Sequence, residues 1–312
     1  MQYRRLGNSG LEVSLVGLGC NNFGRRLDLE GTRAVVDRAL DLGITLLDTA
    51  DVYGQGDSER MLGEILGVRR KHILIATKFG SVMDQAGRMR GASRRYIMTA
   101  VEESLRRLRT DWIDLYQLHG PDPNTPVEET LRALDDLVRQ GKVRYIGSSN
   151  FQGWQVADAE WLGRQIGTNR FVSCQNEYSL LARRSERDLF PAMRAYGLGL
   201  LPFFPLASGF LTGKYRRDHM PEGGRLSGGG GMAERIMTAA NWALLDRLEA
   251  FARERGHTLL DLAFAWLASR PIVSSVIAGA MRPEQVEQNV RAGEWSLTAD
   301  EVAQVDQITA QP

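Results

Sequence analysis

Short apolar runs alternate with longer amphipathic segments along the chain. The length of these runs and their Val, Ile and Leu content are typical of buried strands in a parallel sheet. They cover 13–19, 43–50, 72–78, 112–119, 143–150, 171–178, 198–206 and 274–280. The pattern therefore predicts eight strands.

The segments between the runs have apolar residues at helical spacing, at 32–42, 58–66, 93–108, 127–139, 154–164, 185–196, 259–268 and 283–290. Residues that start or stop helices support these assignments, namely Asp57 as an N-cap, Ser93, Pro126, Gly197 and Pro283. Eight strand-then-helix units favour a closed barrel over an open doubly wound sheet. We therefore predict an α/β fold, a (β/α)8 TIM barrel, with residues 1–312 forming one domain.

Three segments fall outside this repeat. A hairpin at 3–13 is expected to close the N-terminal end of the barrel. The glycine-rich insertion 214–241 is expected to be a mobile loop or a lid. A last helix at 297–308, with Thr298 in an N-cap pattern, is expected to pack on the outside of the barrel.

Composition excludes several classes of partner. The chain has 39 Lys plus Arg and 38 Asp plus Glu, a net charge of +1, with no long block of one sign that would bind nucleic acid or a membrane surface. No run approaches the ~20 apolar residues of a membrane span, and the N-terminus does not resemble a signal peptide. Cys20 and Cys174 are expected to be small core residues. We predict a cytoplasmic protein and leave its oligomeric state open.

Polar or aromatic residues stand at almost every predicted strand end, and any one of them has a simple structural explanation such as a cap or a solvated side chain. In a barrel, however, all strand ends meet at one mouth, where barrel enzymes have their active sites. These residues are Cys20, Asn21, Asp48, Tyr53, Lys78, His119, Ser149, Asn150, Gln175, Asn176, Phe203, Gly279 and Arg282. We predict that they form one site.

Four of these residues suggest proton transfer. A free tyrosine has a pKa of ~10, and an ammonium ~4 Å from its oxygen favours phenolate by about 4 kcal/mol at an effective dielectric constant of ~20. Lys78 is therefore expected to lower the pKa of Tyr53, Asp48 to keep Lys78 charged, and His119 to donate to or orient a substrate oxygen. Asp51 is interpreted as an ordinary loop residue.

Three other signals do not support a function. The stretch 17–24 has the wrong glycine spacing for a Rossmann fold, and 209–215 is one residue short of a P-loop and ends on Tyr215. The four histidines show no spacing typical of metal ligands. We predict no metal.

The motifs taken together resemble those of the aldo-keto reductases, especially a bacterial branch that also resembles potassium-channel β subunits. The matching stretches are LDTADVYG, IATKFG, LYQLHGPD, KVRYIGSSNF, CQNEYSLL, PLASGFLTGKY and IAGAMRPEQVEQN. The resemblance implies a barrel that binds NADPH across its mouth and transfers hydride to an aldehyde or ketone, a small-molecule carbonyl substrate.

The resemblance also implies roles for single residues. Tyr53 would be the general acid, Lys78 and Asp48 would tune it, and His119 would polarise the carbonyl. The expected cofactor-binding residues are Cys20, Asn21, Ser149, Asn150, Gln175, Phe203, Leu206, Ser208, Gly209, Lys214, Gly279, Arg282, Gln285, Gln288 and Asn289. Of these, Ser149, Asn150 and Gln175 would hold the carboxamide and Phe203 would stack on the nicotinamide.

The chain departs from the family pattern at Phe204, Met281 and Gln288, where a serine, a lysine and a glutamate are usual. Arg282 is then the main expected contact for a 2′-phosphate, because a guanidinium suits phosphate geometry. NADP is therefore expected to be preferred over NAD.

Two alternatives stay open. Lys78 could form a Schiff base with a carbonyl substrate, as in aldolases, although a charged lysine is a poor nucleophile. The chain could also bind NADPH and act as a redox-sensing regulatory subunit with little turnover. The substrate itself is not predicted; loops 21–26 and 82–90, Trp154 and the insertion, with Asn22, Phe23 and Met83, are expected to shape its pocket.

Overall fold

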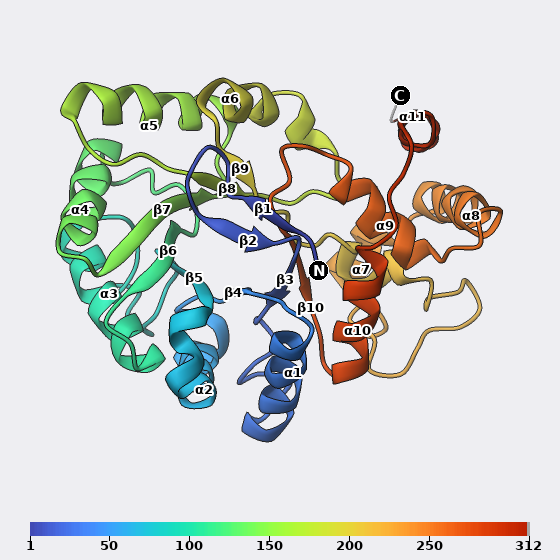
Figure 1. The fold of residues 1–312 in the computed structure, drawn as a ribbon, viewed down its shortest axis with the longest axis horizontal. Helices are drawn as coiled ribbons and strands as arrows, with labels where there is room; N and C mark the ends of the chain where they lie inside the picture. The colour runs from blue at the N-terminus through green and yellow to red at the C-terminus, as the bar shows by residue number, and fades with distance from the viewer. Residues whose placement is uncertain (311–312) are drawn as a thin grey trace.

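The computed structural model describes residues 1–310 and has a curled sheet of eight parallel strands surrounded by helices (Figure 1). The spatial order of the strands is β10-β3-β4-β5-β6-β7-β8-β9. A parallel bridge between Leu200 and Val273, with two backbone hydrogen bonds, joins β9 to the chain just before β10. The (β/α)8 fold class predicted from the sequence is confirmed. The strands are β3 (Val16–Gly19), β4 (Leu46–Asp48), β5 (Leu74–Phe79), β6 (Ile113–Leu118), β7 (Val143–Ser149), β8 (Ser173–Gln175), β9 (Gly199–Leu200) and β10 (Val276–Gly279).

The eight predicted helices are present with small shifts at their ends. Ser93 caps α3 through its side chain, and Pro283 begins α10, as expected. Asp57 is not an N-cap: Gly56 occupies that position, and Asp57 is the first residue of α2. No helix in residues 1–310 is long and apolar enough to cross a bilayer. The helices are α1 (Leu29–Asp41), α2 (Asp57–Leu66), α3 (Arg94–Leu108), α4 (Val127–Arg139), α5 (Gly153–Ile166), α6 (Leu189–Tyr196), α9 (Leu259–Ala268) and α10 (Pro283–Ala292).

The insertion after β9 contains more regular structure than its glycines suggest. It forms α7 (Gly231–Ile236), and its first part is fixed by the buried Tyr215, whose hydroxyl accepts a hydrogen bond from the backbone of Leu226. A further helix, α8 (Ala239–Arg253), was not predicted at all. Its signals were nevertheless present, because Thr238 caps it and its buried residues recur at helical spacing.

The N-terminal hairpin, β1 (Tyr3–Arg5) and β2 (Glu12–Ser14), lies across the centre of the ring of strands in Figure 1. Leu6 and Val13 are fully buried and join a separate apolar cluster with residues of the strands. Those strand residues are Leu46, Ala76, Leu115, Leu201 and Ile277. The predicted closure of this end of the barrel is therefore confirmed. A binding site would have to lie at the opposite end, where the strands have their carboxyl ends.

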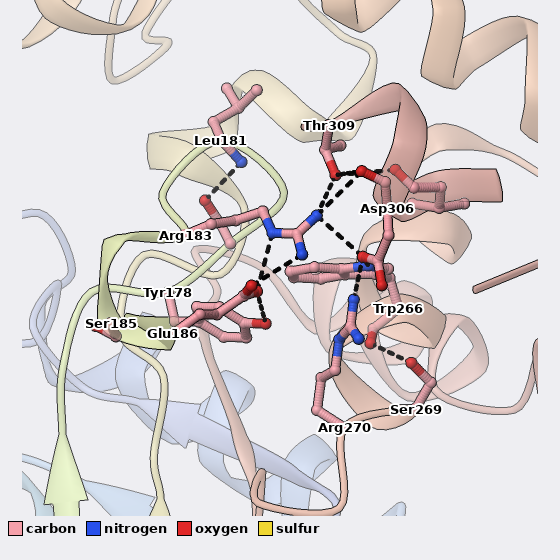
Figure 2. A network of polar contacts seen from close by, with 12 residues as sticks. Tyr178, Leu181, Arg183, Ser185, Glu186, Trp266, Ser269, Arg270, Asp306 and Thr309 are labelled. Carbon is pink, nitrogen blue, oxygen red and sulfur yellow. Dashed lines mark hydrogen bonds and ion pairs between the residues drawn. The ribbon is translucent and has the colours of Figure 1, made fainter. Parts of the chain in front are cut away.

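The predicted C-terminal helix is α11 (Ala299–Ile308), with Thr298 and Glu301 forming a capping box. A polar network attaches it to the loop after β8 and to α9 (Figure 2). The Asp306 carboxylate pairs with Arg183 at 2.9 Å, pairs with Arg270, and accepts a hydrogen bond from Trp266 Nε1 at 3.0 Å. Charge-assisted contacts of this number fix the helix on the outside of the barrel.

Candidate active site

The alternation of side chains along three neighbouring strands builds the floor of the site. Because successive side chains of a strand point to opposite faces, residues two apart share a face. The apolar cluster next to the hairpin includes Leu46, Ala76 and Leu115. Two residues further along the same three strands stand Asp48, Lys78 and Gln117. The change from apolar to polar along each strand therefore places a charged layer directly above the apolar one.

Asp48 and Lys78 form a buried ion pair. The Lys78 Nζ lies 2.9 and 2.8 Å from the two carboxylate oxygens of Asp48, and it also donates to the carbonyl of Thr49 at 2.8 Å. Lys78 has no exposed surface, and Asp48 has almost none. Burial alone would lower the pKa of Lys78, but attraction to Asp48 and to Tyr53 raises it above its ordinary value. Lys78 is therefore an ammonium at neutral pH, as predicted.

Two glutamines complete the surroundings of Asp48. Gln175 Nε2 donates to Asp48 at 2.8 Å, and Gln117 Nε2 lies 3.5 Å from the same oxygen. Sequence reasoning missed Gln117, although its place two residues before His119 on one strand face could have revealed it. It also did not foresee that the Gln175 amide nitrogen would be occupied by Asp48.

Tyr53 follows β4 and lines the cavity beside this pair. Its ring centroid lies 5.2 Å from Lys78 Nζ, so the predicted meeting of phenol, ammonium and carboxylate is present. The predicted direction of its pKa is wrong, however. Burial raises the pKa of Tyr53 above its ordinary value and outweighs the opposing effect of Lys78. The phenol is thus protonated at neutral pH and is suited to donate its proton.

His119 stands opposite Tyr53, with the ring centroids 6.0 Å apart and nearly perpendicular. Its Nδ1 lies 3.1 Å from the Ser81 hydroxyl, a contact that the sequence did not suggest. Burial and the Lys78 charge lower the pKa of His119 to about 3, so the imidazole is neutral. If Ser81 donates to Nδ1, the ring proton lies on Nε2, where it can be donated in turn.

A cavity of about 1000 Å³ opens at this end of the barrel. Every residue expected for catalysis or cofactor binding lines it except Lys78, which lies beneath its floor. Its wall within residues 1–310 also includes Asn22, but not Phe23, Met83 or Trp154. Phe23 is a core residue and Trp154 is largely exposed. Arg26 from loop 21–26, and Glu222 and Arg225 from the insertion, line the cavity as expected of those segments. Thr212 and Leu260 also line it and were not expected to.

Strained backbone gathers at the rim of this cavity. Asn150, Phe204 and Ser208 line it with positive φ angles of 60°, 50° and 59°, and Ala207 beside them has 45°. Such angles cost free energy in non-glycine residues and are concentrated at functional sites. Asn150 is held by two side-chain hydrogen bonds, to the His119 carbonyl at 2.9 Å and to Ser149 at 3.2 Å.

Four cationic side chains line the same cavity: Arg26, Lys214, Arg225 and Arg282. Burial and the charges of Arg26 and Arg282 lower the pKa of Lys214, which shows that these cations are close together. Gly209 lies against Lys214 with a φ of 92°, and a Cβ there would come within 3.3 Å of Nζ. A cluster of cations around a cavity suits phosphate groups.

Other chemistries have less support among the described residues. No three His, Cys, Asp or Glu side chains in residues 1–310 lie where they could share a metal ion. Cys20 and Cys174 are both free and fully buried, and burial raises the pKa of each thiol. The expected role of the two cysteines as core residues is confirmed, although Cys20 also borders the cavity.

Comparison with known proteins agrees with this geometry. A family model described as the aldo/keto reductase family matches residues 15–310. The chain is 36% identical to a probable voltage-gated potassium channel subunit beta of Oryza sativa subsp. japonica, with 94% of this chain and 91% of the relative covered. It is 36% identical to an L-glyceraldehyde 3-phosphate reductase of Escherichia coli (strain K12), with 99% and 93% covered. It is 32% identical to a versiconal hemiacetal acetate reductase of Aspergillus parasiticus, with 98% and 96% covered. The chain belongs to the aldo/keto reductase family.

Proposed function

We propose that the protein is an NADPH-dependent oxidoreductase that reduces aldehydes or ketones to alcohols. The observation that carries this proposal is the combination of a protonated phenol, Tyr53, a buried ammonium, Lys78, and a neutral imidazole, His119, at the edge of one large cavity. The reductase names of two relatives support the same class of reaction.

Tyr53 is proposed as the general acid. As negative charge develops on a carbonyl oxygen during reduction, that oxygen becomes a far stronger base than a phenolate and takes the phenolic proton. Lys78 stabilises the phenolate that remains, because its positive charge lowers the cost of losing the proton. The neutral His119 donates a hydrogen bond to the same oxygen and fixes its position.

The cavity is proposed to hold a nicotinamide dinucleotide, and the residues that line it support this. Lys214, Arg225 and Arg282 would neutralise its phosphates, and Phe203 would contact the nicotinamide ring. The side-chain amide of Asn150 donates its hydrogen bonds to the His119 carbonyl and the Ser149 hydroxyl. Its side-chain oxygen would then accept a hydrogen bond from the carboxamide. When bound, the reduced dinucleotide would supply the hydride. Tyr53 would supply the proton and would regain one from solvent before the next turnover.

The direct test is a panel of aldehydes and ketones with the purified full chain, followed by the loss of nicotinamide absorbance. We expect NADPH to be oxidised with several members of the panel and NADH to be oxidised more slowly. Oxidation of neither dinucleotide with any carbonyl would remove the proposal.

Arg282 is proposed to set the preference for NADPH, and its alanine variant tests this. The guanidinium would pair with the 2′-phosphate, which NADH lacks, so Arg282→Ala should raise the KM for NADPH by about 10- to 100-fold, the equivalent of a charge-assisted contact. The KM for NADH should change little. Arg291→Ala is the matched control, because Arg291 lies on α10, the helix that follows Arg282, and does not line the cavity. Equal losses with both dinucleotides would assign Arg282 another role.

A regulatory role is a second candidate, because several relatives carry the name of a potassium channel subunit beta. Slow turnover that is unaffected by Tyr53→Phe, with intact dinucleotide binding, would favour it. A Schiff base on Lys78 has less support, since the amine is fully buried and charged. Failure of borohydride to trap a carbonyl substrate on Lys78 is the expected result.

A further inference from the structure

A second cluster of ionisable side chains is buried behind the loop that carries Tyr53, and the proposed reaction does not use it. It contains Asp51, Glu59, Tyr96, Arg107 and Tyr116, which come from the loop after β4 and from α2, α3 and β6. All five are buried, and Asp51 and Glu59 have at most 1% of their surface exposed. Two carboxylates therefore share a dry space with one guanidinium.

The two carboxylates are not equally satisfied. Glu59 accepts from Thr77 at 2.5 Å and from Arg107 at 2.6 Å, so each of its oxygens has a strong partner. Asp51 accepts from the Tyr96 hydroxyl at 3.3 Å, and its other carboxylate oxygen is buried without a hydrogen-bond partner among residues 1–310. Between two neighbouring carboxyl groups, the one with fewer donors retains a proton more readily. Asp51 is therefore the group in this cluster that holds a proton.

The cluster touches the Tyr53 loop at both ends. At the start, the backbone N–H of Asp51 donates to the Lys78 carbonyl at 3.1 Å, and Tyr53 follows two residues later. At the end, Gly56 lies directly on Arg107: a Cβ on Gly56 would meet Arg107 Cδ at 2.7 Å. The φ of Gly56 is 91°, so its backbone conformation is a second reason why this position favours glycine. Arg107 therefore packs closely against the end of the loop.

We propose that Asp51 exchanges a proton with solvent and that its charge, acting through Arg107, positions the loop 52–56 and hence Tyr53. This rests on the proposed function of Tyr53. Asp51 is a positioning residue, since it does not line the cavity. When Asp51 is neutral, Arg107 stays on Glu59 and the loop keeps the arrangement described above. When Asp51 is ionised, Arg107 is drawn between two carboxylates and leaves its place under Gly56.

Asp51 is proposed to ionise at a pH in the physiological range. Burial and the Glu59 carboxylate raise the pKa of Asp51 to about 7, while the Val52 amide, Arg107 and Tyr96 act in the opposite direction. The two tyrosines of the cluster do not titrate there. The pKa values of Tyr96 and Tyr116 are raised above the ordinary value of a tyrosine. Arg107 also lies 3.7 Å from the carboxylate of Glu103 on its own helix. His119 is excluded as a source of the same titration by its pKa of about 3.

The kinetic test compares the pH dependence of kcat in the wild type and in Asp51→Asn, which imitates the neutral carboxyl group. If only the protonated form positions Tyr53, kcat of the wild type should fall about tenfold between pH 6 and pH 8, as for one group with a pKa near 7. Asp51→Asn should remain near its pH 6 value throughout. Asp57→Asn, at the end of the same loop but paired with Arg60, should behave as the wild type. The same fall in Asp51→Asn would overturn the positioning role.

A second measurement does not depend on activity. Folded Asp51 keeps its proton up to about pH 7, whereas an unfolded aspartate loses it near 3.8, so stability falls as pH rises between these values. Asp51→Asn escapes this loss. The Tm advantage of the variant over the wild type should therefore grow between pH 5 and pH 8. A difference in Tm that does not change with pH would show that Asp51 does not titrate in this range, even if the protein reduces no carbonyl at all.

Discussion

Tyr53→Phe should lower kcat for carbonyl reduction by a factor on the order of 10² to 10⁴, the usual contribution of a general acid. The substitution removes only the hydroxyl group, so the ring keeps its perpendicular contact with His119. Dinucleotide binding should be unchanged, because the residues proposed to contact phosphates are elsewhere in the cavity wall. The measurement is kcat from nicotinamide absorbance, together with dinucleotide affinity from fluorescence titration.

The control for this prediction is Tyr196→Phe, because Tyr196 lies on α6, does not line the cavity and only accepts a hydrogen bond from Trp161. It should have the wild-type kcat. If Tyr53→Phe kept kcat within a few-fold of the wild type, the proton would have to come from water or from another residue. The assignment of the general acid would then be abandoned, while the family and the fold would stand.

Asp48→Asn should be the most destabilising single change in the site. It leaves the ammonium of Lys78 without a carboxylate in a place that solvent does not reach, and removal of one member of a buried pair costs about 3–5 kcal/mol in the free energy of unfolding. The asparagine oxygen can still accept from Gln175, so lost hydrogen bonds are a minor part of this effect. Denaturant unfolding of both proteins measures the difference.

The stability lost in Asp48→Asn should depend on pH, because the substitution changes the direction in which the pKa of Lys78 is shifted. In the wild type the pKa of Lys78 is raised, so the stabilisation it gives is present at all pH values below about 10 and is lost above its folded pKa. Without Asp48, burial lowers that pKa below its unfolded value. The stability of Asp48→Asn should therefore recover as pH rises towards 10. A loss that is constant with pH would contradict an unpaired ammonium as its cause.

The double variant Asp48→Asn/Lys78→Met separates stability from catalysis. It has no unpaired charge at this place, so its free energy of unfolding should return to within about 1–2 kcal/mol of the wild type, as volume-conserving replacements of buried pairs do. Its kcat should stay as low as that of Asp48→Asn, because nothing then stabilises the Tyr53 phenolate. Recovery of activity in the double variant would show that the pair is needed only for folding.

Local pattern was sufficient for most of the fold. The runs and periodic segments predicted the eight strands, the hairpin and the capped helices such as α3 and α11, because each depends on neighbours within a few residues. The helix α8 was missed although its cap and periodicity were readable, and Asp57 was misplaced by one position. These were errors of interpretation and not limits of the sequence.

The sequence by itself determined which chemical groups stand at the strand ends, and so brought Asp48, Tyr53, Lys78 and His119 to one mouth. Only the tertiary structure decided how these groups behave. Burial and distance set the directions of their pKa values, and both depend on segments far apart in the chain. For that reason the pKa of Tyr53 is raised where local reasoning expected it to be lowered. For the same reason Asp51, an ordinary loop residue in the sequence, is a buried carboxyl group whose pKa is raised to about 7 by burial and by Glu59.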